Sequence, residues 1–291
     1  MGNPTIVSPA LDADIVVDEV RDQVLHSAKF AVPENAQQDI WRALLRWKLW
    51  LSLAWHGLRQ RYKRSWIGVG WIAVSFALFT GIKLVIFGAL TDKPLSFFGP
   101  YLAIGYLSFR FISNSITGGS AAFISSQNWI KAEPMPLMVY IFKLLANNMM
   151  ISLIQIVPAL LICFAFMVPN IAVVWCLPFI LFAFVLNGVS VSVIVGVLCA
   201  RHRDFLYLLT TLMQLLYFAT PILWVPPETG IRASLAVWNP LAHFIAIVRQ
   251  PMIDGTIPWQ SWAVVGGITV FTLVASFITF AVARRRIVFW L

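Results

Sequence analysis

Six apolar stretches of the chain, separated by short polar segments, are each about long enough to cross a lipid bilayer. A transmembrane helix needs about 20 predominantly apolar residues, because each residue advances the helix by about 1.5 Å and the hydrocarbon layer is about 30 Å thick. We therefore predict an all-α polytopic membrane domain over residues 66–291, with six transmembrane helices. The predicted spans are residues 66–90, 98–120, 137–168, 172–199, 204–224 and 260–283.

The region before the first span has the periodicity of an amphipathic helix. Within residues 38–65, apolar side chains recur every three or four positions, and cations stand at both ends. Four tryptophans lie between Trp41 and Trp55, and tryptophan is enriched at the headgroup level of membranes. We predict an amphipathic helix that lies in the inner membrane interface. A soluble helix packed on a partner protein is the alternative.

Residues 1–37 are polar and rich in acidic residues, so they predict a mobile cytoplasmic tail. The segment begins Met1-Gly2-Asn3-Pro4 and has neither the basic nor the apolar region of a signal peptide. Seven of the twelve acidic residues lie within the first 39 positions. Acidic charge is therefore concentrated ahead of the membrane domain.

Composition supports a membrane protein, and the placement of charge predicts its orientation. Only 11% of the residues are charged and 60% are hydrophobic, whereas about a quarter of the residues of a soluble domain are charged. Positive charge gathers before the first span, between the fourth and fifth spans, and after the sixth. Cytoplasmic loops carry the excess of Lys and Arg, so both termini are predicted in the cytoplasm. The clusters are Arg59, Arg61, Lys63 and Arg64, then Arg201 and Arg203, then Arg284, Arg285 and Arg286.

The segment between the fifth and sixth spans, residues 225–259, is apolar and rich in proline. Asn239-Pro240 predicts a helix start, with Asn at the N-cap and Pro at the first position. The helical stretch that follows is too short to span a membrane. We predict short re-entrant helices that dip into the outer leaflet, because helices satisfy their own backbone hydrogen bonds.

Two patterns inside the spans predict packing. The fourth span has a small residue at every fourth position, which lets another helix approach closely, although a substrate groove on that face is the alternative. These residues are Gly188, Ser192, Gly196 and Ala200. Cys163, Cys176 and Cys199 lie in apolar stretches without metal-ligand spacing, so they are predicted to be small buried hydrophobes.

No carboxylate lies in the interior of a predicted span, so the acids that serve catalysis or ion coupling are missing there. Transporters driven by protons or sodium generally need ionisable or coordinating groups near the membrane centre. The chain also has no carboxylate pair for acid–base catalysis, no GxxxxGK[ST] phosphate loop and no HExxH motif. We predict no catalytic residue, metal site or cofactor in this chain, so active transport would need energy from another subunit. The acidic residues after position 39 lie in predicted loops or at the very start of a span: Asp92, Glu133, Asp204, Glu228 and Asp254.

Cations and aromatic rings within the spans are candidates for contact with a substrate. Lys83 and Lys143 lie near enough to the membrane surfaces to extend their ammonium groups there. Arg110, deeper in the second span, contacts either a ligand or pore, or backbone carbonyls and side chains such as Ser113 and Asn114. Aromatic faces suit the stacking of sugar rings, although packing is the alternative for each residue. The candidate channel lining is Tyr106, Phe109, Arg110, Tyr217, Phe218 and Trp224.

Two segments on the predicted cytoplasmic side could receive a motor subunit. Residues 121–136 form an amphipathic piece that ends at two prolines, and a tight turn precedes the fifth span. Helix ends between spans are places where a motor domain could push on membrane helices, and ordinary connecting loops are the alternative. The candidate coupling residues are Trp129, Lys131, Glu133, Pro134, Met135, Arg201, His202, Arg203 and Asp204.

Three stretches, in this order, resemble the ABC-2-type permeases of polysaccharide exporters, whose cargo is O-antigen, capsule or teichoic acid. They are LRQRYKRSWIGVGW (58–71), TPILW (220–224) and NPLAHFIAIVR (239–249). The likeness extends over residues 38–291. One departure is Val74-Ser75-Phe76, where relatives often carry proline.

The resemblance implies a homodimeric, multi-pass permease of the bacterial cytoplasmic (inner) membrane. Two separate ATP-binding cassette subunits would hold ATP and Mg, and a polyprenyl-diphosphate-linked glycan would move outward through a channel between the two permeases. The segment around residues 133–136 would be a coupling helix, and Asn239, Pro240 and Arg249 would belong to the outer re-entrant helices. Arg59, Arg61, Lys63 and Arg64 would meet the diphosphate, a role that suits cations beside the inner leaflet. Setting the membrane orientation is the alternative role of these four residues.

The leading hypothesis is export of a lipid-linked polysaccharide, powered by a separate ATPase, with membrane lipids and a second copy of the chain as further partners. Nucleic acid is not an expected partner, because the cations flank apolar spans. An ABC-2 exporter of a lipid or drug would share the fold. A membrane-embedded enzyme that modifies glycans or lipids is the alternative from another class. ATPase activity that depends on this chain would distinguish a transporter from that enzyme.

Overall fold

The computed structural model describes residues 35–132, 135–166, 170, 172–227 and 229–291. Within these ranges every regular element is a helix, as the apolar pattern predicts. The predicted tail lies outside the described residues except for its last three positions. In chain order the helices are α2 (Ala36–Leu45), α3 (Trp47–Arg61), η1 (Gly68–Gly70), α4 (Trp71–Gly88), α5 (Leu95–Ala121), η2 (Ile124–Ser126), α6 (Gln127–Ala132), α7 (Met138–Phe166), α8 (Ala172–Arg201), α9 (Asp204–Ala219), α10 (Ile231–Trp238), α11 (Pro240–Ile253) and α12 (Trp259–Trp290).

Five of the described helices are long and apolar enough to cross a membrane, and they match predicted spans one, two, three, four and six. The helix in the fifth predicted span, α9, has only 16 residues and is about 24 Å long. The prediction of a span over residues 204–224 is therefore too long. Helix α9 ends because Thr220 precedes Pro221 and adopts the extended conformation that proline favours in its neighbour (φ −88°, ψ 140°).

The segment between α9 and α12 contains the two short helices α10 and α11. Both are apolar, but they meet at an angle of 84°, so the pair forms either a broken span or a re-entrant loop. Asn239 caps α11, because its Oδ1 accepts a hydrogen bond from Leu241 N at 2.9 Å, and Pro240 follows at the first position. The predicted helix start is confirmed. If the bent pair is counted as one span, the described chain has six candidate spans, which is the predicted number. The sixth candidate is then the α10–α11 pair rather than the predicted span over residues 204–224.

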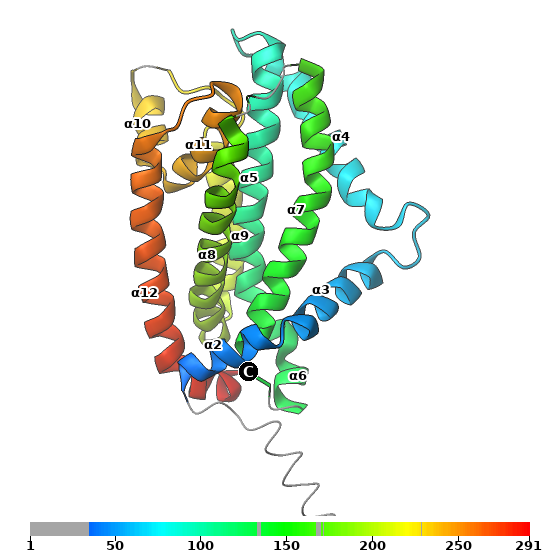
Figure 1. The fold of residues 1–291 in the computed structure, drawn as a ribbon, viewed down its shortest axis with the longest axis vertical. Coiled ribbons are helices and arrows are strands. Elements are labelled where there is room, and N and C mark those ends of the chain that lie inside the picture. Colours follow the sequence, from blue (N-terminus) through cyan, green and yellow to red (C-terminus); the bar gives the residue numbers. More distant parts are fainter. Residues whose placement is uncertain (1–34, 133–134, 167–169, 171, 228) are drawn as a thin grey trace, which may run out of the picture.

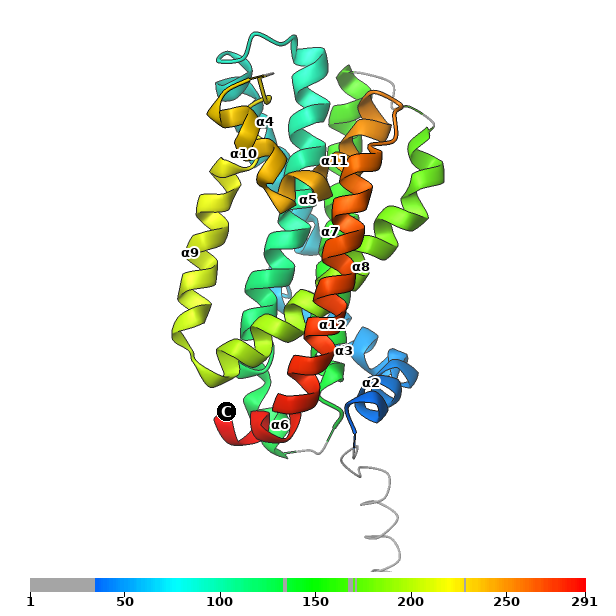
Figure 2. The same ribbon diagram turned by 90° about the vertical axis from the view of Figure 1, so that its left-hand side faces the viewer.

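Helix α5 is the centre of the bundle. It packs against α4, α7, α8, α9 and α11, while α12 packs against α8 (Figures 1 and 2). The small-residue face of α8 lies on α5, where Ser192 Oγ donates to Ser115 O at 2.9 Å. A Cβ on Gly196 would lie 3.0 Å from Gly119 O, so the close approach predicted from the small residues is confirmed. The three cysteines are buried, also as predicted.

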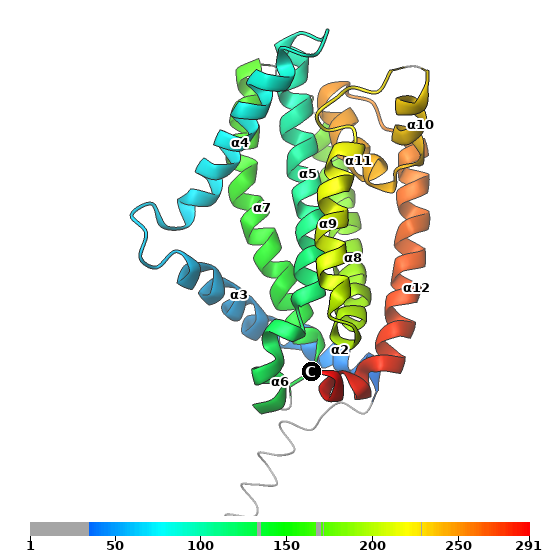
Figure 3. The ribbon, with the colours of Figure 1, turned by 180° about the vertical axis from the view of Figure 1, so that it is seen from behind.

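The predicted amphipathic helix at residues 38–65 consists of two helices rather than one. The chain breaks at Arg46, whose backbone leaves the helical conformation (φ −88°, ψ 34°). Ala43 O accepts hydrogen bonds from Arg46 N and from Trp50 Nε1, both at 3.2 Å, and these bonds tighten the end of α2. Helix α3 packs against α7 and runs obliquely outward from the bundle, and a loop at its end turns back into α4 (Figures 1 and 3). Its placement in a membrane interface stays a prediction.

A buried ion pair fastens α2 to the bundle. Asp39 is 1% exposed, and its Oδ2 lies 3.2 Å from Nε of Arg284 on α12. Its carboxylate also accepts hydrogen bonds from the backbone N–H groups of Leu137 and Met138, beside the start of α7. Burial raises the pKa of Asp39 above its ordinary value of 3.8, although the two N–H groups and Arg284 act in the opposite direction. In the sequence, Asp39 looks like one more acidic residue of the N-terminal region.

The segments predicted to be cytoplasmic lie toward one end of the bundle. Helices α2 and α6, the α8–α9 turn and the C-terminus are found there, and the α4–α5 connection and α10 lie toward the other end (Figures 1 and 2). The arrangement agrees with the alternation of loops expected for membrane-crossing helices. The side of the membrane on which each end lies stays a prediction.

Candidate functional site: a polar and aromatic cleft along helix α5

Three residues of α5 are shared by two hollows in the bundle. Arg110, Asn114 and Thr117 follow one another at spacings of four and three, so they lie on one helix face, and they line both hollows. The amide groove opens between α3, α4, α5 and α7 and has a volume of about 440 Å³. The aromatic hollow lies between α4, α5 and α9 and has a volume of about 400 Å³. Together they form a cleft along α5.

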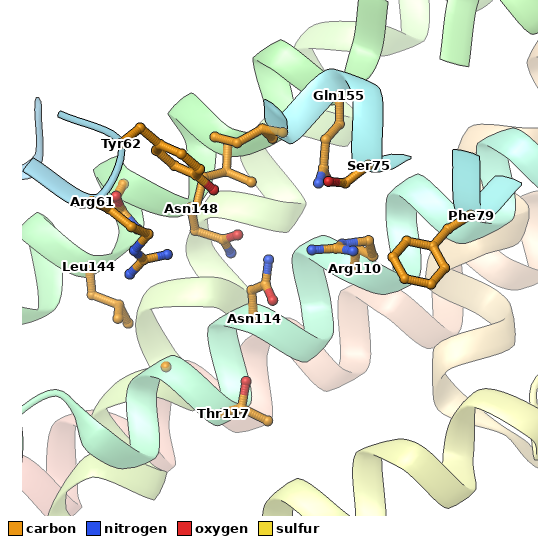
Figure 4. Close-up of a pocket in the computed structure, with 14 residues that line it drawn as sticks. Arg61, Tyr62, Ser75, Phe79, Arg110, Asn114, Thr117, Leu144, Asn148 and Gln155 are labelled. Atoms are coloured by element: carbon orange, nitrogen blue, oxygen red, sulfur yellow. The ribbon is translucent and has the colours of Figure 1, made fainter. Parts of the chain in front are cut away.

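The amide groove is lined by polar side chains of α5 and α7, as Figure 4 shows. Asn147, Asn148 and Gln155 of α7 share one helix face. Asn148 Nδ2 donates to Phe111 O and to Ser115 Oγ, both at 2.9 Å, and these acceptors fix the orientation of the amide. Asn148 Oδ1 and Gln155 Oε1 are buried without a hydrogen-bond partner in the described structure.

Arg110 is the charged centre of the cleft. Its Nη1 donates to the Tyr106 hydroxyl at 3.2 Å, while its Nε is buried without a partner among the described residues. In the described chain, no hydrogen bond joins Arg110 to Ser113, Asn114 or a backbone carbonyl. Of the two interpretations offered by the sequence, its position between the two hollows favours contact with a ligand or pore.

Lys83 of α4 reaches into the aromatic hollow. Its Nζ lies 3.5 Å from the centre of the Tyr106 ring and 4.7 Å from that of the Tyr217 ring. Such cation–π contacts hold an ammonium group against aromatic faces, so the expectation that Lys83 extends to the membrane surface is wrong. Tyr217 also packs edge-to-face on Phe109 and Phe218, with ring centres 5.2 and 5.5 Å apart.

The aromatic hollow gathers most of the residues predicted to line a channel. Trp224 lies instead in a neighbouring hollow of about 490 Å³, which shares Phe218 with the aromatic hollow. The rings of Tyr106 and Phe109 are largely buried, so they also pack the interior. Their contact with a moving substrate stays a prediction. The predicted residues around the aromatic hollow are Tyr106, Phe109, Arg110, Tyr217 and Phe218.

Hydrogen bonds join the two later segments of the family resemblance. Asn239 Nδ2 donates to Thr220 Oγ1 at 2.9 Å, and Arg249 Nη1 donates to Pro221 O at 3.0 Å. The guanidinium carbon of Arg249 lies 3.5 Å from the centre of the Tyr101 ring. Tyr101 donates its own hydroxyl proton to Pro221 O, at 3.1 Å. These contacts hold α11 against α5 and against the chain that follows α9.

Only one of the four cations predicted to bind a diphosphate reaches the cleft. Arg61, the last residue of α3, lines the amide groove. Arg59, Lys63 and Arg64 are exposed and line neither of the two hollows. Arg59 is two residues before Arg61 and points to another side of the helix, while the other two lie beyond the helix end. A role in binding diphosphate stays a prediction for all four.

Helix α6 and the α8–α9 turn, which carry most of the predicted coupling residues, lie toward the end of the bundle that carries the C-terminus (Figure 2). Trp129 and Lys131 are exposed on α6, and Met135 is half-buried against the core. Glu133 and Pro134 lie outside the described residues. Contact with a motor subunit stays a prediction for this group. The residues at the α8–α9 turn are all exposed: Arg201, His202, Arg203 and Asp204.

The polar residues of α7 were not among the sequence predictions, although the pattern contains a signal for them. Three amides, at positions 147, 148 and 155, interrupt the third apolar stretch, and they fall on one helix face. Polar side chains at membrane depth are costly and usually functional. The sequence does not predict the position of the Lys83 side chain, because depth in an apolar stretch does not say which way a side chain turns.

The cleft combines three kinds of recognition chemistry. Its cations can bind phosphate, its amides can bind hydroxyl groups, and its rings can stack on sugars. Within the described part of the chain, no carboxylate lines the amide groove or the aromatic hollow. Nor does that part contain a group of three or more His, Cys, Asp or Glu side chains placed to hold a metal ion.

The long apolar helices define a multi-pass helical membrane protein, with a cleft beside α5. Its sequence is similar to the O-antigen export system permease protein RfbA of Klebsiella pneumoniae, with 27% identity over 209 residues, 70% of this chain and 79% of the relative. RfbA of Myxococcus xanthus is 20% identical over 214 residues, 72% of this chain and 82% of the relative. No family model matches the chain. The relatives confirm the resemblance to ABC-2-type permeases of polysaccharide exporters.

Proposed function

We propose that this chain is the transmembrane subunit of a polysaccharide exporter. The finer proposal is an ATP-driven exporter that moves a polyprenyl-diphosphate-linked polysaccharide, of the O-antigen or capsule type, outward across the bacterial inner membrane. Two relatives that share most of their length with this chain are named as O-antigen export permeases. The observation that carries the proposal is the position of Arg110, which joins a polar groove to an aromatic hollow along one helix.

The cleft suits the two chemistries of such a substrate. Arg61 and Arg110 both line the amide groove, and a guanidinium group can bind phosphate oxygens through two parallel hydrogen bonds. The aromatic hollow offers ring faces on which sugars stack with little directional bonding. Carboxylates would repel a diphosphate, and none lines these hollows in the described structure.

The proposal places the energy source and the second half of the pathway on other chains. ATP and Mg would be held by two ATP-binding cassette subunits, which would contact α6 and the α8–α9 turn. Helix α9 packs mainly on α5, and it leaves Tyr207, Leu215 and Phe218 exposed. A second copy of the chain against this face would close the aromatic hollow, which supports a homodimer. Both termini would lie in the cytoplasm.

Reconstitution tests the proposal directly. Proteoliposomes that contain this chain and its ATP-binding subunit should move a lipid-linked glycan across the bilayer only when ATP and Mg are supplied. ATPase activity of the pair should rise when the lipid-linked glycan is present. Transport at full rate by this chain alone would overturn the proposal. So would a pair that moves small drugs or phospholipids but not the glycan.

A further inference from the structure

Unpartnered polar atoms in the amide groove indicate the kind of group that occupies it. Gln155 is 2% exposed and Asn148 is 3% exposed, yet neither Gln155 Oε1 nor Asn148 Oδ1 has a hydrogen-bond partner among the described residues. Buried polar atoms without partners are rare in proteins, because each has given up hydration without a replacement. An occupant of the groove should therefore supply the missing hydrogen bonds.

The missing partners are of two kinds. The amide nitrogen of Asn148 donates to Phe111 O and Ser115 Oγ. These two bonds identify the other amide atom, Oδ1, as the acceptor. This oxygen needs a donor, and the oxygen of Gln155 needs one too. Arg110 Nε, which is also buried and unpartnered, needs an acceptor. The two amide oxygens therefore require an occupant that donates hydrogen bonds, and Arg110 requires an acceptor beside that occupant.

This requirement separates the possible occupants. An ionised phosphate only accepts hydrogen bonds, and a lipid acyl chain does neither, so both leave the amide oxygens unsatisfied. A hydroxyl group donates and accepts. The aromatic rings of Tyr62 and Phe79 also line the groove (Figure 4), and such rings suit the apolar faces of a sugar. The volume of about 440 Å³ is that of a small-molecule site.

We propose that the amide groove binds a sugar residue of the lipid-linked glycan, next to the diphosphate that Arg61 and Arg110 hold. This inference rests on the proposed function and names the part of the substrate that the groove recognises. Its consequence is selectivity: the permease prefers a polyprenyl diphosphate that carries sugar to the same lipid without sugar. Gln155 and Asn148 supply that selectivity, and Arg61 supplies affinity for either lipid.

The test compares two probes on the full-length chain in lipid nanodiscs. One probe is a short-chain polyprenyl diphosphate that carries a disaccharide, and the other is the same diphosphate without sugar. The wild type should bind the glycosylated probe about tenfold more tightly, as expected for one or two additional hydrogen bonds. Gln155→Met keeps the length of the side chain but removes the amide oxygen, so it should abolish most of that preference by weakening binding of the glycosylated probe far more than binding of the bare probe.

Matched variants separate the sugar site from the phosphate site and from the fold. Ser152→Ala removes another buried, unpartnered polar group from the same helix, outside the groove, and should keep the wild-type preference. Arg61→Ala should weaken binding of both probes to a similar extent. If Gln155→Met does not fold, Asn148→Ala, which removes the other unpartnered amide oxygen, takes its place.

The outcomes distinguish failure of this inference from failure of the proposed function. If the wild type binds both probes equally tightly, the sugar site is wrong while the proposed substrate class stands. A groove variant that keeps the full preference for the glycosylated probe also overturns the sugar site. If the wild type binds neither probe, the proposed function fails as well.

Discussion

Among single residues, Arg249 shows most clearly how a side chain positions a whole helix. It is buried, its Nη1 donates to Pro221 O, and its guanidinium lies over the ring of Tyr101. Gly105 faces this guanidinium so closely that a Cβ there would overlap Nη2. The family resemblance places Arg249 in the outer re-entrant helices, and it lies within α11 (Pro240–Ile253). The sequence cannot predict the Gly105 contact, because the two residues lie 144 positions apart and meet only when α11 folds back on α5.

Gly105→Ala tests this contact. The added methyl group should displace the guanidinium of Arg249 and destabilise the protein by about 1–3 kcal/mol, as overpacking in a protein interior does. Gly81→Ala is the matched control, because a Cβ on Gly81 of α4 meets no atom within 4 Å. Melting temperatures of the purified variants in detergent measure the difference. Equal melting temperatures would show that Arg249 is not held as described.

Among the elements, α2 depends on one buried contact for its position. The sequence predicts helical periodicity over residues 38–65. Helices α2 and α3 fall in this region, except that α2 begins two residues earlier, at Ala36. The sequence does not predict the break at Arg46, because periodicity says nothing of the docking of α2 on α7 and α12. Asp39 ties these three helices together through Arg284 and two backbone N–H groups.

Asp39→Ala should destabilise the protein by about 3–5 kcal/mol, because it breaks a buried ion pair and removes the acceptor of the Leu137 and Met138 N–H groups. Asp39→Ala combined with Arg284→Met should cost less than the sum of the single changes, and a double-mutant cycle on thermal unfolding measures that coupling. Additive effects would contradict the description of the ion pair.

Acid should not release α2 from the bundle. The pKa of Asp39 is higher in the folded protein than its ordinary value of 3.8. The stability that results from this difference is therefore fully present below pH 3.8, and it is lost as the pH rises through the folded-state pKa. The difference in melting temperature between the wild type and Asp39→Ala should therefore hold or grow as the pH falls from 7 toward 4. A difference that shrinks on acidification would mean that the pKa of Asp39 is lowered instead.

For the whole molecule, the long apolar stretches allow the membrane domain to be predicted with few alternatives, because only helices satisfy their backbone groups within a segment in lipid. Arg110 can be singled out from the sequence because it is a charged residue within an apolar stretch. The aromatic residues around it can be singled out as large rings within such stretches. The cleft itself cannot be predicted in this way. It exists because α4, α7 and α9 surround one face of α5, and the sequence does not say which helices become neighbours.

We propose that the cleft along α5 forms part of the route of the polysaccharide. Asn114 lines both hollows, so Asn114→Trp would fill their junction. Val270 on α12 is 64% exposed and lines neither hollow. Val270→Trp therefore adds the same bulk outside the cleft. The decisive measurement is the amount of surface polysaccharide in cells whose only copy of this chain carries one of these changes. At equal amounts of membrane-inserted protein, we expect strong loss of surface polysaccharide with Asn114→Trp and normal export with Val270→Trp. Normal export with Asn114→Trp would contradict the proposed route.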